Sequence, residues 1–278
     1  MNSNLPAGAS PGLDDERLRA LVVDLRNPEA QVIAGFLPLQ FGDLCIGHVA
    51  PEFAAWLAAR KHLIGVRDGR LWIDPQRSSE RLSADWQALA LLCREAGWLP
   101  AWRDERYLVR HPADGRPLCC LERGAFRRFG LRSEAVHVNG IAQDGCMWVA
   151  RRAMSKAVDP GMLDNIVGGG IAAGEAVKDA LLRECEEEAG IPAEVVAGVR
   201  RSRRLVSLRR ERDGIHHEIL HIFDLHLPRG FMPCNQDGEV AAFSLMGRDA
   251  LTDALLGKAF TVDAGAVAAD YLLRSSAA

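Results

Sequence analysis

Four glutamates fall within five consecutive positions of this 278-residue chain, at 184 and 186–188. On a helix, with about 100° per residue, Glu184, Glu187 and Glu188 share an arc of roughly 100°. Like charges three or four residues apart cost about 0.2–0.5 kcal/mol per pair, and carboxylates near a helix C-terminus oppose the helix dipole. This face needs a positive partner, and oxygen ligands without histidine or cysteine suit Mg²⁺ or Mn²⁺. A solvated acidic helix end is the alternative interpretation.

The residues around the glutamates predict the elements that position them. A predicted strand ends in three glycines at 168–170, a loop follows, and a helix is expected over residues 175–189. Gly190 comes next, where a residue in the left-handed conformation commonly ends a helix. Leu181, Leu182, Cys185 and Ala189 form an apolar arc beside the acidic one. One face of the helix is therefore expected in the core, and the adjacent face carries carboxylates.

Residues 169–191 match a longer pattern than the glutamates alone. They fit G-x5-E-x7-R-E-U-x-E-E-x-G-U, where U is an aliphatic residue, at every fixed position. Cys185 stands at an aliphatic position, which a small buried thiol fills without changing the chemistry. The chain therefore resembles the Nudix hydrolases, which split phosphoanhydride bonds of organic diphosphates with the help of metal ions.

The resemblance implies roles for the charged residues of this segment. Glu184, Glu187 and Glu188 correspond to the ligands of Mg²⁺ or Mn²⁺, and Glu187 or Glu188 is also a candidate base for the attacking water. Arg183 corresponds to the residue that orients the glutamates. Glu175 corresponds to a structural acid bonded to Arg183, or is simply an acid favoured at the start of a helix.

Two glycines and a second acidic segment complete the predicted catalytic machinery. Gly169 and Gly170 correspond to positions where the backbone turns and approaches metal or phosphate. In many Nudix enzymes an acid outside the motif serves as the base, and the segment 237–239 ahead of a predicted strand offers one. An Asp-Gly turn explains Asp237 well and Glu239 poorly. Glu239 is therefore an outer ligand or base, with a surface position as the alternative.

Two cations upstream are candidates for binding the substrate. Arg152 and Lys156 lie between a predicted strand and a Pro-Gly turn, in the place where similar enzymes present cations to substrate phosphates. Solvated loop cations are the alternative. His216, His217 and His221 fall in a strand-like segment, and we interpret them as ordinary strand residues rather than zinc ligands.

Alternation and turn signals predict two domains. Residues 1–130 are expected to form an α+β domain that is accessory or shapes the substrate site, and residues 131–278 a Nudix α/β/α sandwich with a mixed sheet. Expected helices cover residues 14–25, 51–59, 79–96, 121–130 and 175–189, and two more close the chain. Expected strands or hairpins cover residues 32–46, 63–73, 135–141, 147–151 and 240–245.

Segments beyond the motif resemble one Nudix subgroup. VHVNGIAQDGCMWVARRAMSK and LPLQFGDLCIGHVAPEFAAWL are similar to the Nudix proteins related to thiamine pyrophosphokinase, which carry an extra N-terminal domain. This implies hydrolysis of thiamine diphosphate, or of its oxidised analogues, to the monophosphate. Trp148, Phe223 and Phe231 are candidates to stack on a ring in a neutral pocket that favours the oxidised analogues, or are buried core residues. An ADP-ribose or NADH-type dinucleotide pyrophosphatase is the alternative activity, and a non-catalytic Nudix binding module is a third interpretation.

Composition narrows the classes of partner. A net charge of −3 gives no basic surface for nucleic acid, and no apolar segment reaches the roughly 20 residues that cross a bilayer. The polar first residues lack the apolar core of a signal peptide. We therefore expect a soluble, cytoplasmic enzyme that acts on a small-molecule organic diphosphate, with a homodimer left open. Seven cysteines without a C-x-x-C pair indicate reduced thiols.

Overall fold

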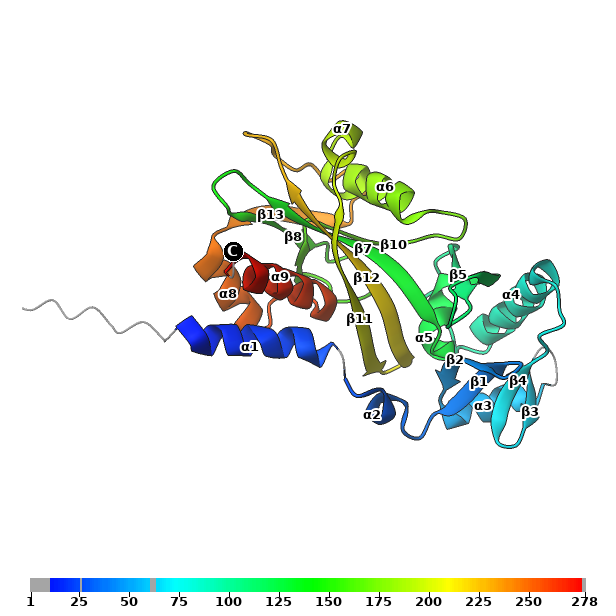
Figure 1. The fold of residues 1–278 in the computed structure, drawn as a ribbon. Helices are drawn as coiled ribbons and strands as arrows, with labels where there is room; N and C mark the ends of the chain where they lie inside the picture. The colour runs from blue at the N-terminus through cyan, green and yellow to red at the C-terminus, as the bar shows by residue number, and fades with distance from the viewer. Residues whose placement is uncertain (1–10, 26, 61–63, 277–278) are drawn as a thin grey trace, which may run out of the picture.

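The computed structural model describes residues 11–25, 27–60 and 64–276 (Figure 1). Residues 1–10 of the predicted polar segment 1–14 and the start of the predicted hairpin at residue 63 lie outside these ranges. Among the helices that the structure describes, none is long and apolar enough to cross a membrane.

A mixed sheet of seven strands forms the centre of the C-terminal part of the chain. Its strands are β7 (Arg132–Ile141), β8 (Met147–Arg152), β9 (Leu163–Asn165), β10 (Val167–Gly170), β11 (Arg201–Glu211), β12 (Gly214–His226) and β13 (Val240–Met246). The order is β11-β12-β7-β8-β13, while β10 pairs with β7 and β9 pairs with β8. Only β7 and β12 run parallel among these described pairs. The strands predicted at 135–141, 147–151 and 240–245 are confirmed.

Helices cover both faces of this sheet (Figure 1). One face carries α6 (Val177–Ala189) and α7 (Ala193–Val196), and the other carries α1 (Pro11–Asp24), α8 (Arg248–Leu256) and α9 (Val262–Ser275). Leu181 of α6 packs into one apolar core with Val136, and Leu251 of α8 packs into another with Val149. The predicted α/β/α sandwich with a mixed sheet is confirmed.

Helix α1 packs far from its neighbours in sequence. Leu18 of this helix is buried with Leu163 and Leu272 in the core beneath α9, although it belongs to the segment predicted as the first domain. In Figure 1 the helix lies beside α9. The division at residue 131 stays a prediction, with α1 on the far side of it.

The N-terminal part of the chain forms a smaller α+β unit. Its elements are α2 (Glu29–Ile33), β1 (Leu37–Phe41), β2 (Leu44–Val49), α3 (Pro51–Ala58), β3 (Gly65–Arg67), β4 (Arg70–Ile73), α4 (Ser79–Glu95), β5 (Arg106–Arg110), β6 (Pro117–Glu122), the 3₁₀ turn η1 (Arg123–Ala125) and α5 (Phe126–Phe129). Four strands form a sheet in the order β2-β1-β4-β3, and β5 and β6 form a separate hairpin. Phe53 and Trp86 each meet the ring of Phe129 edge to face in its core. The predicted smaller α+β domain is confirmed.

Two predicted helices differ from the observed ones. The segment 121–130 is α-helical only at Phe126–Phe129, because Leu121 pairs with Tyr107 in the β5–β6 hairpin. The helix predicted from residue 175 begins at Val177. Glu175 remains in the preceding turn, where its carboxylate accepts a hydrogen bond from the Ala172 N–H at 3.1 Å.

The two units meet along β5 and α5. The N–H of Ala173, in the loop that leads into α6, donates to the carbonyl of Arg106 in β5 at 2.8 Å. Helix α5 approaches β12 so closely that a Cβ at Gly214 would lie 2.0 Å from the carbonyl oxygen of Arg127. The loop before α6 is therefore attached to the N-terminal unit.

Candidate active site

Helix α6 presents its glutamates beside an apolar face. Leu181 and Cys185 are buried in the core, and Glu184 and Glu188 on the adjacent face are also buried. The side chain of Glu187 is 47% exposed. The apolar and acidic arcs therefore lie side by side, as the sequence pattern predicts, and Gly190 with φ of 61° ends the helix in the left-handed conformation.

Arg183 connects the acids of the segment. Its Nε and Nη2 donate to the two carboxylate oxygens of Glu175 at 2.7 and 2.9 Å, which confirms the bond between these residues. Its Nη1 donates to Glu184 at 2.7 Å and to Glu187 at 3.2 Å. Because of the hydrogen bonds from Arg183, the pKa of Glu175 is lowered. One guanidinium thus fixes two helix acids relative to the turn before the helix.

The three glycines at the end of β10 make room for other groups. The N–H of Gly168 donates to Glu188 Oε2 at 2.7 Å. A Cβ at Gly169 would lie 2.0 Å from the carboxyl carbon of Glu184, and one at Gly170 would lie 1.4 Å from the hydroxyl oxygen of Tyr107. Side chains at these positions would displace a catalytic candidate or a residue of β5, so the strand needs glycine there.

Glu188 is a buried carboxyl group without a cationic partner. Within the described chain, no Lys, Arg or His lies within ion-pair distance of it, and its hydrogen-bond donor is the Gly168 backbone. Burial raises the pKa of Glu188 well above its usual range, and the carboxylates of Glu184 and Asp164 raise it further. Burial also raises the pKa of Glu184, although Arg183 opposes that shift. A nearby cation would relieve this cost.

The loop before β13 brings two more acids to this helix. Glu188, Asp237 and Glu239 each have a carboxylate oxygen within 4.8 Å of the others. Burial raises the pKa of Glu239, but the ion pair with Lys156 outweighs burial and lowers that pKa. Glu184, by contrast, is hydrogen-bonded to Arg183. Oxygen donors around an uncompensated buried carboxyl group fit a divalent cation of the Mg²⁺ or Mn²⁺ type.

The two upstream cations already have protein partners. Arg152 donates to Asp164 at 2.8 Å and, from Nε and Nη2, to the Val158 carbonyl at 3.2 and 2.9 Å. Lys156 is paired with Glu239. Both residues line the cavity described next, and their contact with phosphate stays a prediction.

A cavity of about 270 Å³ lies between the two units. Ser133, Ala135 and His137 alternate along β7 and line it. Gly168 pairs with His137, and Glu218 pairs with Ser133. The end near Gly168 and the end near Glu218 are therefore separated by four residues of β7, about 13 Å.

The N-terminal unit supplies one wall of this cavity. Arg103, Tyr107, Arg123 and Phe126 all line it. The Tyr107 hydroxyl is buried and has no hydrogen-bond partner within the described residues. No motif in the sequence indicated these residues, because the domain contact that brings them to the site has no local pattern.

The aromatic residues proposed for stacking lie elsewhere. Trp148 and Phe223 are buried in the core beneath α6, and Phe231 packs against that core. Their alternative interpretation as core residues is therefore correct. His216 is a strand residue, as expected, but it lines the cavity together with Glu218. Their spacing of two residues on one strand was the signal that both share a face.

Comparisons with known proteins agree with this geometry. Residues 132–267 match the NUDIX domain, and residues 18–133 match a domain of unknown function, DUF4743. Nudix hydrolase 24, chloroplastic, from Arabidopsis thaliana is 30% identical over 261 residues, which span 91% of this chain and 71% of that protein. The chain belongs to the Nudix hydrolase family. It is therefore a Nudix hydrolase enzyme, and such enzymes generally use divalent metal ions.

Further similarities cover less of the chain. Nudix hydrolase 20, chloroplastic, from Arabidopsis thaliana is 29% identical to this chain. The aligned segment spans 79% of this chain and 62% of the Arabidopsis protein. A crystal structure of a Deinococcus radiodurans protein aligns with a TM-score of 0.46 and 19% identity, over 61% of this chain and 98% of that one. The matched domain and the 30% identical relative confirm the predicted superfamily, while the thiamine-related subgroup stays a proposal.

Proposed function

We propose that this Nudix hydrolase splits the phosphoanhydride bond of a small organic diphosphate into orthophosphate and an organic monophosphate. The observation that carries the proposal is the cavity between the two units. At one end it is lined by Glu239 and by Gly168, whose N–H donates to the buried carboxyl group of Glu188, and it has room for one small organic group. A terminal diphosphate has a single anhydride bond, so these two products account for all its atoms and those of one water.

The acids of α6 and of the loop before β13 would hold the metal ion. Glu184, Glu187 and Glu188 are the proposed ligands of Mg²⁺ or Mn²⁺. Glu239 lies close enough to Glu188 to serve as an outer ligand if it is not the base. When bound, the ion supplies positive charge that offsets the charge of the diphosphate oxygens. Arg183 keeps Glu184 and Glu187 in place through its hydrogen bonds.

The remaining polar groups would position the phosphates. Gly169 and Gly170 line the cavity, where their backbone is the proposed phosphate contact, while Glu184 and Tyr107 fill the space that side chains there would take. Lys156 is the proposed phosphate contact, since its ion pair with Glu239 lies at the cavity. Arg152 is the second candidate, but three of its hydrogen bonds already go to Asp164 and a backbone carbonyl.

A carboxylate must take the proton of the attacking water. Glu239 is the first candidate because it lies at the cavity beside Glu188. Burial raises its pKa, but the ion pair with Lys156 outweighs burial, so the group is ionised and can accept a proton. The exposed Glu187 is the second candidate. The water oxygen bonds to one phosphorus while the bridging P–O bond breaks, and the departing phosphate keeps the bridging oxygen.

For the organic group we propose thiamine diphosphate or its oxidised analogues. The resemblance of the flanking segments supports this choice, and so does the cavity volume. At about 270 Å³ it lies just below the roughly 300–1,000 Å³ of typical ligand sites, which favours one small group over a dinucleotide. The cavity wall carries the charged groups of Glu218 and Asp263 besides the aromatic rings of Tyr107 and Phe126, so it gives no reason to prefer an uncharged ring.

A comparison of substrates in the presence of Mg²⁺ or Mn²⁺ tests both the proposed catalysis and the proposed thiamine-type substrate. Thiamine diphosphate, its oxo and oxy analogues, ADP-ribose and NADH are compared by kcat/KM, with release of orthophosphate and monophosphate measured. Glu188→Gln is expected to reduce turnover by orders of magnitude, whereas Glu194→Gln on the exposed surface of α7 should not.

Two outcomes would contradict different parts of the proposal. Full, metal-independent activity of Glu188→Gln would overturn the catalytic assignment. A preference for ADP-ribose or NADH above about tenfold, equal to roughly 1.4 kcal/mol, would overturn the thiamine assignment alone. A cytoplasmic location and a homodimer stay predictions.

A further inference from the structure

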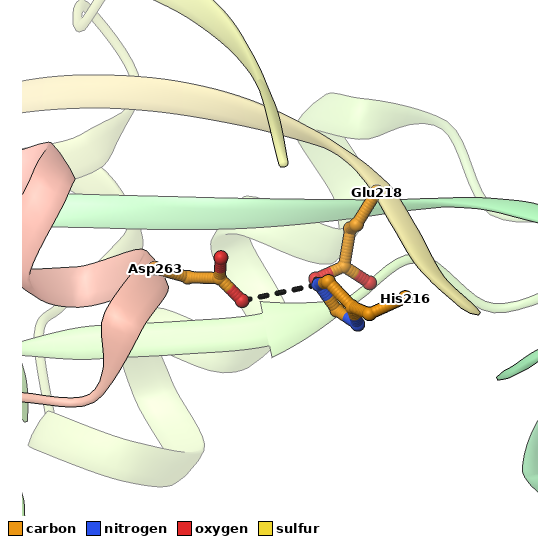
Figure 2. A group of neighbouring side chains, drawn as sticks. All are labelled: His216, Glu218 and Asp263. Carbon is orange, nitrogen blue, oxygen red and sulfur yellow. Dashed lines mark ion pairs between the residues drawn. The ribbon is translucent and has the colours of Figure 1, made fainter. Parts of the chain in front are cut away.

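A second group of titratable side chains lies at the end of the cavity away from Glu188 (Figure 2). His216 and Glu218 lie two residues apart on β12, and Asp263 is in the first turn of α9. One ligand atom of each lies within 4.8 Å of the others. Figure 2 shows both carboxylates directed at the same edge of the imidazole.

Asp263 already has a cationic partner. Arg209 donates from Nη1 and Nη2 to its two oxygens at 2.7 and 3.2 Å. Burial raises the pKa of Asp263, but His216 and Arg209 outweigh burial and hold that pKa well below its usual range. A divalent ion bound here would lie close to the Arg209 guanidinium, and the repulsion disfavours a metal site.

His216 and Glu218 retain hydrogen-bonding capacity. His216 is only 7% exposed. Its Nε2 lies at ion-pair distance from Asp263 Oδ2, 3.2 Å, and from Glu218 Oε2, 3.8 Å, but the geometry makes a hydrogen bond with neither carboxylate nor with another described residue. Ser133 donates to Glu218 Oε1 at 2.7 Å, and Oε2 accepts no hydrogen bond from the described chain. Leaving a buried polar group unpaired is costly, so a ligand that pairs with it gains affinity.

The position of this pair suits the organic part of a substrate. Glu218 is four residues of β7 away from the glycines that adjoin Glu188, about 13 Å. A diphosphate bound at the Glu188 end therefore directs its organic group along β7 toward His216. The two ends of one substrate would occupy the two ends of the cavity.

We propose that His216 and Glu218 recognise an amino-substituted nitrogen heterocycle, an inference that depends on the function proposed above. Glu218 Oε2 accepts a hydrogen bond from the amino group. Because two carboxylates lie beside it, Nε2 of His216 carries the proton and donates to the adjacent ring nitrogen. An acceptor and a donor side by side match the edge of an aminopyrimidine ring. Thiamine derivatives and adenine nucleotides both present such an edge, and the small cavity favours the former.

The test compares kcat/KM for thiamine diphosphate, ADP and isopentenyl diphosphate, which carries no nitrogen. Glu218→Gln and His216→Gln are expected to lower kcat/KM at least about tenfold for the preferred amino-substituted substrate, mainly through KM. Activity on isopentenyl diphosphate should stay within about twofold, because its diphosphate contacts are unchanged. The ratio of kcat/KM for thiamine diphosphate to kcat/KM for ADP distinguishes a thiamine derivative from an adenine nucleotide as the ligand.

His226→Gln is the matched control, because His226 is an exposed residue at the other end of β12. It should leave all three activities unchanged. Melting temperatures establish that each variant is folded, and Glu218→Asp, which withdraws the carboxylate but keeps its charge, replaces a Gln variant that fails to fold.

Equal losses on all three substrates, or no loss on any, would overturn the recognition proposal while leaving the hydrolase intact. If the wild-type protein hydrolyses none of them, the catalytic proposal fails instead. In that case, the equilibrium dissociation constants of thiamine diphosphate and ADP test the recognition proposal independently of catalysis. Weaker binding by the variants supports it, and equal binding, or no binding by the wild type, overturns it.

Discussion

The buried carboxyl group of Glu188 makes the stability of the metal-free protein depend on pH. Burial and the neighbouring carboxylates raise its pKa in the folded state above the usual 4.5. Between the unfolded and folded pKa values, the folded state binds more protons than the unfolded state. The free energy of unfolding therefore falls as the pH rises from about 4.5 through the folded pKa, and it is constant above that value.

Glu188→Gln removes this titration while keeping the shape of the side chain. One proton contributes a slope of up to about 1.4 kcal/mol per pH unit, or roughly 3–6 °C in melting temperature per pH unit for 150–250 residues. With a chelator present, the wild-type melting temperature is expected to fall more steeply toward alkaline pH than that of the variant. Glu184, whose pKa is also raised, leaves part of the slope in both proteins.

The assay is a series of thermal melts from acid to mildly alkaline pH, with EDTA and then with millimolar Mg²⁺ or Mn²⁺. A metal at 100 times its Kd stabilises the wild type by about 2.7 kcal/mol, and the variant should gain less. Glu194→Gln, an exposed acid on α7, controls for the loss of a charge and should keep the wild-type slope. Parallel curves for wild type and Glu188→Gln in EDTA would refute the reasoning.

Two more substitutions at the cavity are expected to act differently, one lowering turnover and the other raising stability. Glu239→Gln should lower kcat more than it raises KM and alter the acid limb of the pH profile of kcat, because Glu239 is ionised beside Lys156. A wild-type kcat in steady-state assays would show that Glu239 is a surface residue without a catalytic role. Tyr107→Phe should raise the free energy of unfolding by about 1–3 kcal/mol in urea titrations, because its buried hydroxyl has no partner among the described residues. A less stable variant would show that the hydroxyl is bonded in solution.

The acidic helix could be predicted because its causes are local. Helical periodicity places Glu184 and Glu188 on one face, and a glycine ends the helix at 190. The hydrogen bond between Arg183 and Glu175 could also be predicted, since both residues belong to one short motif. Strand alternation likewise predicted β7, β8 and β13 within one or a few residues.

The shape of the cavity could not be predicted in the same way. Tyr107 reaches Gly170 only because the hairpin of one unit packs beside a strand of the other. His216 reaches Asp263 only because α9 packs over β12 after a connection of more than thirty residues. Pairings between such distant segments depend on how cores pack, and periodicity within a single segment carries no information about them.

The loop between β10 and α6 is hydrogen-bonded to β5 of the N-terminal unit. This arrangement separates substitutions that affect substrate fit from substitutions that affect catalysis. The groups proposed to cleave the anhydride lie within the motif and the loop before β13, whereas Arg103, Tyr107 and Phe126 line the cavity from a different unit. On this proposal, substitutions in that unit are expected to alter which organic group fits without replacing the cleaving groups. Selectivity can thus diverge while the chemistry stays constant, provided that the contact between Ala173 and Arg106 is preserved.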